Sequence, residues 1–199
     1  MQPDESGGQP INSYALVSYI PDPLGPFLNQ LRIEMLEGCT ARAHVTVLPP
    51  RPLVHPAEEA WQELVEALED TTPFLLDTTA VEIFPVSSVI YLGIGNGFQQ
   101  VKALHALLNR SKLAFQEPFP FHPHITLAQG LNPDRIGPVA TCARQRWAGY
   151  CGPRSFPVRS LEFVQNTIFP ETGANCWINL GECPLRPAHR PAQQLGRND

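Results

Sequence analysis

Residues 44–50 read His-Val-Thr-Val-Leu-Pro-Pro, and residues 122–130 read His-Pro-His-Ile-Thr-Leu-Ala-Gln-Gly. Each segment holds a His-x-Thr triplet in a short β-forming run, beginning at His44 and at His124. Side chains alternate between the two faces of a strand, so residues i and i+2 share a face. Each triplet therefore presents an imidazole beside a hydroxyl, and the residue between them, Val45 or Ile125, is expected to point into the core.

A similar order of elements surrounds each triplet, with β-forming runs, helical spacing of apolar residues, and prolines and glycines between them. Around the first triplet we expect a strand at 14–20, a helix at 24–36, a strand at 43–48 closed by Pro49 and Pro50, a helix at 57–68 and a strand at 74–84. Around the second we expect a strand at 88–94, a turn at Asn96-Gly97, a helix at 98–108, a strand at 124–128, a helix at 133–147, and strands near 158–165 and 175–180.

This repeated strand-helix-strand pattern predicts two similar lobes related by an approximate twofold axis. The two triplets would then face each other across a cleft between the lobes. The sequence identity between the halves is low, so the repeat is one of pattern only. We expect one bilobal domain over residues 1–183, and residues 184–199 are expected to be disordered because they contain few apolar side chains.

The composition excludes several classes of protein. With 199 residues, 43% of them hydrophobic and 17% charged, the chain can bury a core. The formal net charge of −5 argues against an extended nucleic-acid surface, so an RNA substrate would be held at one terminus. There is no apolar run of about 18 residues, which predicts that the chain does not enter a membrane. Five cysteines without a C-x-x-C pair favour a reducing cytoplasm and argue against zinc held by cysteine.

Two imidazoles and two hydroxyls around one small volume suit reaction at a phosphodiester. In-line displacement at phosphorus needs a base on the attacking oxygen and an acid on the leaving oxygen, and histidine can fill both roles near neutral pH. The hydroxyls can donate to the non-bridging oxygens, where negative charge develops. This chemistry requires no metal and no cofactor.

Two other interpretations of the triplets stay open at this stage. The histidines can be ordinary half-buried strand residues, which is the usual outcome for a single His-x-Thr match. Alternatively, His44, His122 and His124 can ligate zinc, although Pro123 makes a strand that includes His122 doubtful.

The segments HVTVLPP and HPHITLAQG resemble the two signature motifs of the two-histidine (2H) phosphoesterases, which include RNA 2′-5′ ligases and 2′,3′-cyclic nucleotide phosphodiesterases. The resemblance covers about residues 12–182. It implies a bilobal α+β fold in which antiparallel sheets line a central cleft and helices lie outside. It also implies catalytic positions for four residues: His44, Thr46, His124 and Thr126. Many members carry a basic residue at the position of Gln129, where this chain departs from the pattern.

This resemblance implies an enzyme that opens 2′,3′-cyclic phosphates, on a nucleotide or an RNA terminus, to 2′-phosphates. Ligation of 2′-5′ RNA is the same displacement with another nucleophile, and the sequence does not separate the two reactions. The resemblance also implies that His124 is the base and His44 the acid. The alternative is a non-catalytic module of the same fold that binds RNA ends or nucleotides. Retention of all four motif residues argues against that alternative, because binding alone needs no acid and base.

Two further residues are candidates for substrate binding. Arg51 follows the first motif closely and can reach a phosphate, and a solvated loop arginine is an equal alternative. Phe169 is expected in a loop over residues 169–173, where its ring can stack on a base. Packing of Phe169 against the neighbouring lobe is the alternative role.

Overall fold

The computed structural model describes residues 8–36, 39, 42–171 and 174–186. The first motif lies among β1 (Gln9–Tyr19), α1 (Leu24–Met35), β2 (His44–Arg51), α2 (Ala57–Ala67) and β3 (Phe74–Ile83). The second lies among β4 (Ile90–Ile94), α3 (Phe98–Leu108), the short 3₁₀ helix η1 (Ser111–Leu113), β5 (His124–Ala128), α4 (Pro133–Ala148) and β6 (Ser155–Val158). Two long strands follow, β7 (Ser160–Phe169) and β8 (Ala174–Pro184).

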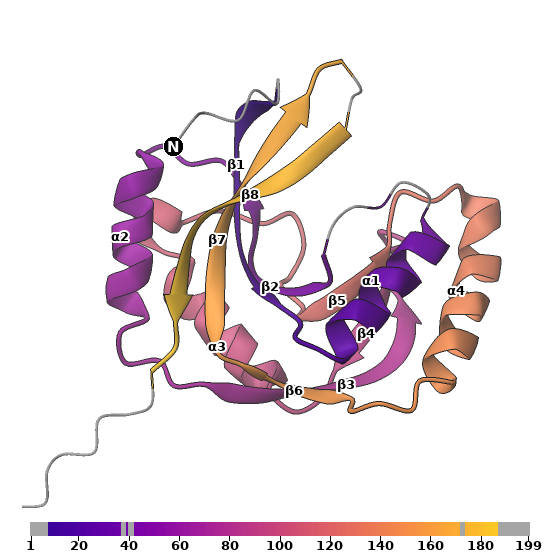
Figure 1. The fold of residues 1–199 in the computed structure, drawn as a ribbon. Coiled ribbons are helices and arrows are strands. Elements are labelled where there is room, and N and C mark those ends of the chain that lie inside the picture. The colour runs from indigo at the N-terminus through magenta and orange to yellow at the C-terminus, as the bar shows by residue number, and fades with distance from the viewer. Residues whose placement is uncertain (1–7, 37–38, 40–41, 172–173, 187–199) are drawn as a thin grey trace, which may run out of the picture.

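These strands form two antiparallel four-stranded sheets, with the orders β2-β1-β7-β8 and β5-β4-β3-β6. Figure 1 shows α2 and α4 on opposite sides of the molecule, flanking the sheets. The predicted α+β class with two antiparallel sheets is confirmed. Each motif strand, β2 or β5, is an edge strand of its own sheet and lies beside the other motif strand.

The two halves of the chain are interleaved, which the repeat in the sequence did not predict. Strand β3 follows α2 but joins the second sheet, and the β7–β8 hairpin returns from the end of the chain to complete the first. The helices cross over too, because α1 lies against β5 and α3 lies against β2. Each lobe is therefore built from both halves of the sequence.

One large hydrophobic core joins the two lobes. It takes side chains from all four α-helices and from both sheets, including Leu28, Val45, Leu64 and Ile125, each at most 1% exposed. The predicted Asn96-Gly97 turn begins α3: Gly97 has φ +83°, and a Cβ there would lie 2.5 Å from the carbonyl oxygen of Leu75. Glycine is required at that turn by both conformation and space.

Several strand boundaries differ from those expected, and two of the differences have a clear structural reason. Strand β2 continues through Pro49 and Pro50 to Arg51, because an edge strand tolerates residues that donate no hydrogen bond to a neighbour. The single strand expected near 158–165 is two strands: β6 ends at Val158 in the second sheet, and β7 begins at Ser160 in the first. A continuous β-forming sequence does not reveal that change of sheet.

The last described residues belong to the folded domain. Strand β8 reaches Pro184, and Leu185 is 6% exposed and donates its backbone N–H to the carbonyl of Arg159. The disorder expected at 184–199 is therefore not found at residues 184–186, and residues 187–199 lie outside the described part of the chain.

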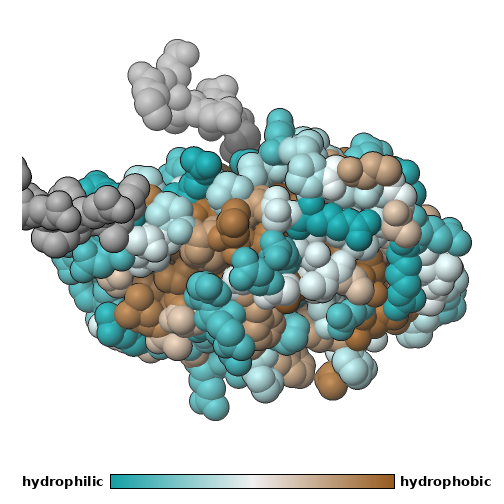
Figure 2. Space-filling view, turned by 90° about the horizontal axis from the view of Figure 1, so that it is seen from below, coloured by the Kyte–Doolittle hydropathy of each residue, from teal (hydrophilic) through white to brown (hydrophobic). Residues whose placement is uncertain are grey.

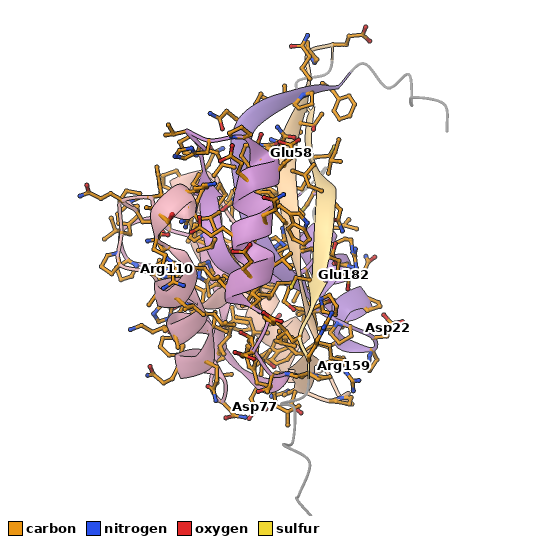
Figure 3. All side chains as sticks on the ribbon, turned by 90° about the vertical axis from the view of Figure 1, so that its left-hand side faces the viewer. Asp22, Glu58, Asp77, Arg110, Arg159 and Glu182 are labelled. Carbon is orange, nitrogen blue, oxygen red and sulfur yellow. The ribbon has the colours of Figure 1, made fainter. Side chains whose placement is uncertain are left out.

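Acidic and basic side chains are interspersed on the surface. Figure 3 looks onto the side covered by α2, where acidic residues such as Glu58 and Glu182 and basic residues such as Arg110 and Arg159 are exposed. Within the described residues, no helix has the length and apolar character needed to cross a membrane.

The buried Arg51 joins the end of β2 to the segment that precedes the second motif. Its side chain is 2% exposed, and Nη1 donates to Asn109 Oδ1 at 2.7 Å and to the carbonyl of Leu113 at 2.8 Å. Its Nη2 donates to Glu117 Oε1 at 2.7 Å, and His105 Nε2 lies 2.8 Å from the same oxygen. A buried guanidinium needs such partners, because desolvating it is costly.

This arrangement makes Glu117→Ala a strongly destabilising change. Removing one partner of a buried ion pair leaves the other charge uncompensated, so we expect the free energy of unfolding to fall by about 3–5 kcal/mol in chemical denaturation. The control is Lys112→Met, which removes the exposed ion pair with Glu59 and should leave the stability nearly unchanged. Equal, small effects of the two substitutions would contradict the structural role of Arg51.

Candidate active site

The two motifs adopt the same local structure on β2 and β5. Val45 is 1% exposed and Ile125 is 0% exposed, so the middle residue of each triplet points into the core as predicted. His44 and Thr46 share the opposite face of β2, and His124 and Thr126 share that of β5. All four are half-buried.

Both imidazoles are held in the same way. His44 Nδ1 lies 2.7 Å from the carbonyl oxygen of Arg42, and His124 Nδ1 lies 2.7 Å from the carbonyl oxygen of His122. A carbonyl oxygen can only accept, so each Nδ1 carries its proton and donates. In the neutral imidazole, Nε2 is therefore the basic atom on both histidines. Because the two contacts match, Nε2 of each histidine is available as a proton acceptor.

His124 is close enough to affect His44 electrostatically. Burial is the largest cause that lowers the pKa of His44, and the charges of Arg32 on α1 and of His124 lower it further. Together they bring the pKa of His44 to about 4. The pKa of His124 is also lowered, mainly by burial and further by the neighbouring His122. Without a ligand, His44 is neutral at neutral pH.

Aromatic rings surround His124 more closely than His44. The rings of Phe84 and Tyr91 lie edge-on to His124, with centroids 4.9 and 5.4 Å away, and they stack on each other at 4.0 Å. Tyr19 lies edge-on to His44 at 6.0 Å. These rings account for part of the burial that disfavours the charged imidazoles.

The register of the sheets reveals a second internal repeat. In the first sheet Thr46 pairs with Val17, which pairs with Glu162; in the second, Thr126 pairs with Tyr91, which pairs with Glu82. Directly paired residues project from the same face of a sheet. Each motif threonine therefore shares its face with a glutamate two strands away, at roughly 10 Å between backbones.

The two glutamates have different partners. The Tyr91 hydroxyl donates to Glu82 Oε2 at 3.0 Å, and burial together with this carboxylate raises the pKa of Tyr91 to about 12. Asn179 donates to Glu162, whose pKa is raised mainly by burial. Tyr91 is thus a neutral hydrogen-bond donor and not a base. Sequence reasoning missed Phe84, Tyr91 and both glutamates, because only strand register brings them to the motifs.

The two predicted substrate contacts are not brought together with the histidines. Arg51 is buried, and its guanidinium bonds to protein groups at the other end of β2, so the structure gives it a structural role instead of a place beside a phosphate. Phe169 is the last residue of β7 and not a loop residue. It follows the residue paired with Gln9, at the opposite end of β1 from Tyr19, which pairs with His44.

His122 contributes its backbone carbonyl to the site, while its ring packs among aromatic side chains. That ring lies edge-on to Phe84, Tyr91 and Phe98, with centroids 5.1–5.9 Å away. Among the described residues, no group of three histidine, cysteine, aspartate or glutamate side chains is arranged to hold a metal ion. The zinc interpretation therefore finds no ligand set in the part of the chain that the structure describes.

Helix α1 contributes two residues that sequence reasoning also missed. Asn29 Oδ1 accepts a hydrogen bond from the backbone N–H of Ala43, the residue before His44, at 2.6 Å. Arg32 is 7% exposed and donates to the backbone carbonyl of Thr126. The available signal was a charged residue on the face of the helix that also carries Leu28 and Leu31.

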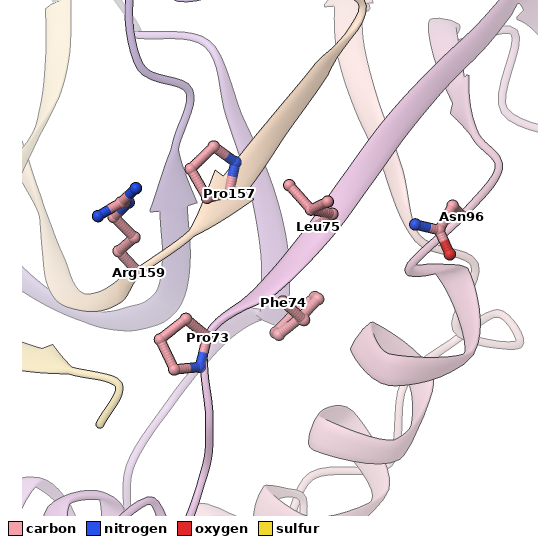
Figure 4. A pocket seen from close by; sticks show the side chains of 6 residues that line it. All are labelled: Pro73, Phe74, Leu75, Asn96, Pro157 and Arg159. Carbon is pink, nitrogen blue, oxygen red and sulfur yellow. The ribbon is translucent and has the colours of Figure 1, made fainter. Parts of the chain in front are cut away.

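A surface depression lies elsewhere, where β3 meets β6. It has a volume of about 520 Å³, and Figure 4 shows its lining side chains: Pro73, Phe74, Leu75, Asn96, Pro157 and Arg159. Figure 2 views the molecule from below, the side of β3 and β6 in Figure 1, and shows hydrophobic surface between hydrophilic side chains. None of the six lining residues belongs to a motif, and they include no acid-base pair.

Comparison with known proteins agrees with this architecture. Residues 20–167 match the 2′-5′ RNA ligase superfamily. A protein of Oceanobacillus iheyensis named as a phosphoesterase is 36% identical over 87 residues, which are 41% of this chain and 51% of that protein. The chain thus spans about half the length of this curated relative.

Solved structures share the fold at low sequence identity. E. coli LigT without ligand has a TM-score of 0.60 at 18% identity, covering 92% of this chain and 100% of LigT. LigT complexed with 3′-AMP has a TM-score of 0.60 at 19% identity, covering 90% and 99%. TT0787 of Thermus thermophilus has a TM-score of 0.57 at 18% identity, covering 89% and 100%.

The family match extends over most of the chain and includes both His-x-Thr triplets, on strands that the structure places side by side. The predicted family is therefore confirmed, and the chain belongs to the 2′-5′ RNA ligase superfamily, within the two-histidine phosphoesterases.

Proposed function

We propose that this protein is a metal-independent phosphodiesterase that opens 2′,3′-cyclic phosphates of nucleotides or RNA ends to 2′-phosphates. The observation that carries the proposal is the matched pair of imidazoles, each donating through Nδ1 to a carbonyl oxygen two residues before it. This leaves Nε2 of both His44 and His124 as the atoms that exchange protons with substrate. A site that only bound phosphate would need no such pair.

In the proposed reaction, one Nε2 removes a proton from water as its oxygen bonds to phosphorus. The bond from phosphorus to the 3′-oxygen breaks, and the other imidazole supplies the proton that this oxygen takes. Thr46 and Thr126 donate their hydroxyl hydrogens to the non-bridging oxygens, which gain charge in the transition state. The product is the 2′-phosphate with a free 3′-hydroxyl.

One imidazole has to be protonated before this reaction, although burial favours the neutral form in the ligand-free site. The bound phosphodiester is an anion, and an opposite charge within about 4–6 Å favours the charged form of an imidazole. Bound substrate therefore favours protonation of the imidazole that acts as the acid catalyst. We expect the protonated form only when the site is occupied.

The same geometry supports 2′-5′ RNA ligation, in which a 5′-hydroxyl replaces water as the nucleophile. The family name and the LigT complex with 3′-AMP support a nucleotide or RNA terminus as the ligand. The mixed charges seen in Figure 3 support recognition of an end instead of a long RNA backbone. Free cysteines support an action in the cytoplasm.

The first test is turnover of 2′,3′-cyclic nucleotides with a chelator present, which we expect to leave the rate unchanged. His44→Ala and His124→Ala should each lower kcat by about 10²–10⁴, the usual contribution of a positioned acid or base. His55→Ala, at an exposed loop histidine, is the matched control. Binding of the nucleotide without turnover by the wild-type protein would favour the non-catalytic module instead.

A second test separates the acid from the base. The family resemblance makes His44 the acid, whereas the charge of Arg32 opposes its protonation and favours the reverse. We retain His44 as the acid, because the anionic substrate adds the missing attraction. A substrate whose 3′-leaving group departs without a proton should then restore His44→Ala far more than His124→Ala. Restoration in the opposite order would exchange the two roles.

A third test follows the protonation of His44 by NMR. The imidazole resonances should titrate with a midpoint of about 4 in the free protein, below the usual 6.5, because burial disfavours the charge. Saturating inorganic phosphate should raise that midpoint, since the anion stabilises the imidazolium. A midpoint near 6.5 in the free protein would show that the site is more open to water than described.

A further inference from the structure

Helix α1 makes a polar contact with each of the two motifs. Asn29 accepts from the backbone N–H of Ala43 at 2.6 Å, immediately before His44. Arg32 donates to the backbone carbonyl of Thr126, inside the second motif. Asn29 and Arg32 are three residues apart and so lie on one face of the helix. One turn of α1 thus forms hydrogen bonds with the backbone at both motifs.

The burial of Arg32 makes a merely incidental contact unfavourable. Arg32 is 7% exposed, and its neighbours on α1 include Leu28 and Leu31, both 0% exposed. A guanidinium in such surroundings is destabilising unless its donors are satisfied. An apolar residue would pack at this position without that cost, so the charge and its hydrogen bonds require an explanation beyond packing.

The topology supplies that explanation. Strands β2 and β5 are both edge strands, and among the described residues each is paired with another strand on one side only. The carbonyl of Thr126 on β5 accepts a hydrogen bond from Arg32, a side chain of α1. In the part of the chain that the structure describes, no strand pairing joins the two sheets to fix the distance between the motifs, whereas α1 contacts both motif regions.

We propose that α1 fixes the distance between the two motifs, with Asn29 and Arg32 as positioning residues. The inference rests on the proposed function for its kinetic consequences. Its physical content is a fixed spacing between Nε2 of His44 and Nε2 of His124. Asn29 holds the first motif through the backbone, and Arg32 holds the second.

The charge of Arg32 gives this role a signature that simple packing lacks. Burial lowers the pKa of His44 most, the carbonyl of Arg42 raises it, and the charges of Arg32 on α1 and His124 on β5 lower it further. Tyr19 faces His44 from β1 through its ring edge, and the guanidinium of Arg42 lies over that ring at 3.9 Å. Removing the Arg32 charge alone should therefore make His44 easier to protonate.

The test compares Arg32→Met, Arg32→Lys and Asn29→Ala with Gln30→Ala as the matched control. Gln30 lies on the same helix, is exposed and contacts Glu34 instead of a motif. For each variant, kcat and KM on a 2′,3′-cyclic nucleotide, the NMR midpoint of His44 and the unfolding midpoint are measured.

Arg32→Met should lower kcat about 100-fold, the scale of a displacement near 1 Å, with a smaller effect on KM. It should also raise the His44 midpoint. Arg32→Lys should keep the low midpoint while losing part of kcat, since an ammonium cannot reproduce the guanidinium geometry. Asn29→Ala should lower kcat without raising the His44 midpoint, because it removes no charge. Gln30→Ala should change neither kcat nor the midpoint.

The positioning role of α1 would be refuted if Arg32→Met had wild-type kcat and an unchanged His44 midpoint, with only a lower unfolding midpoint. If Arg32→Met does not fold, the same comparison is made with Arg32→Lys and Asn29→Ala, and wild-type kcat in both would overturn it. The NMR titration needs no turnover. An inactive wild-type protein would therefore refute the proposed function, while the response of His44 to loss of Arg32 would still decide the inference.

Discussion

The central constraint on this molecule is that its two motif strands are edges. A strand inside a sheet is fixed on both sides by backbone hydrogen bonds, whereas β2 and β5 are each paired with a single strand among the described residues and meet at a seam between two sheets. Chemistry that needs two imidazoles on opposite sides of one phosphorus therefore depends on contacts other than strand pairing. Those contacts come from helices, side chains and the shared core.

Two buried arginines serve this seam in different ways. Arg32 joins α1 to the carbonyl of Thr126, close to the proposed chemistry. Arg51 lies at the far end of β2, where it fixes the segment before the second motif through Glu117 and the Leu113 carbonyl. Both pair a charge on one half of the sequence with acceptors on the other. Buried charge is an uncertain source of stability, but its hydrogen bonds select one arrangement of the two lobes.

Local sequence predicted most elements because the periodic patterns and the proline and glycine breaks agree with the tertiary structure. It failed where the outcome depends on which sheet a strand joins. Val158 and Ser160 read as one strand yet lie in different sheets. Arg51 follows the first motif in sequence and Phe169 was expected in a loop, while strand direction carries both away from the histidines. The motif histidines and threonines were found because i and i+2 spacing is local. Asn29, Tyr91 and Glu82 reach the site through long-range contacts that no local pattern reveals, and Arg32 is distinguished in the sequence only as a charge on the apolar face of its helix.

The return of β7 and β8 to the first sheet has a consequence for biosynthesis. Strand β1 is made early, but its neighbour β7 leaves the ribosome more than 140 residues later, since Val17 pairs with Glu162. Until then β1 has only β2 beside it, and a two-stranded ribbon is marginally stable in water. The nascent chain therefore carries a β-edge that can pair with other chains, and the first half-site gains its full support only when translation of the domain is nearly complete.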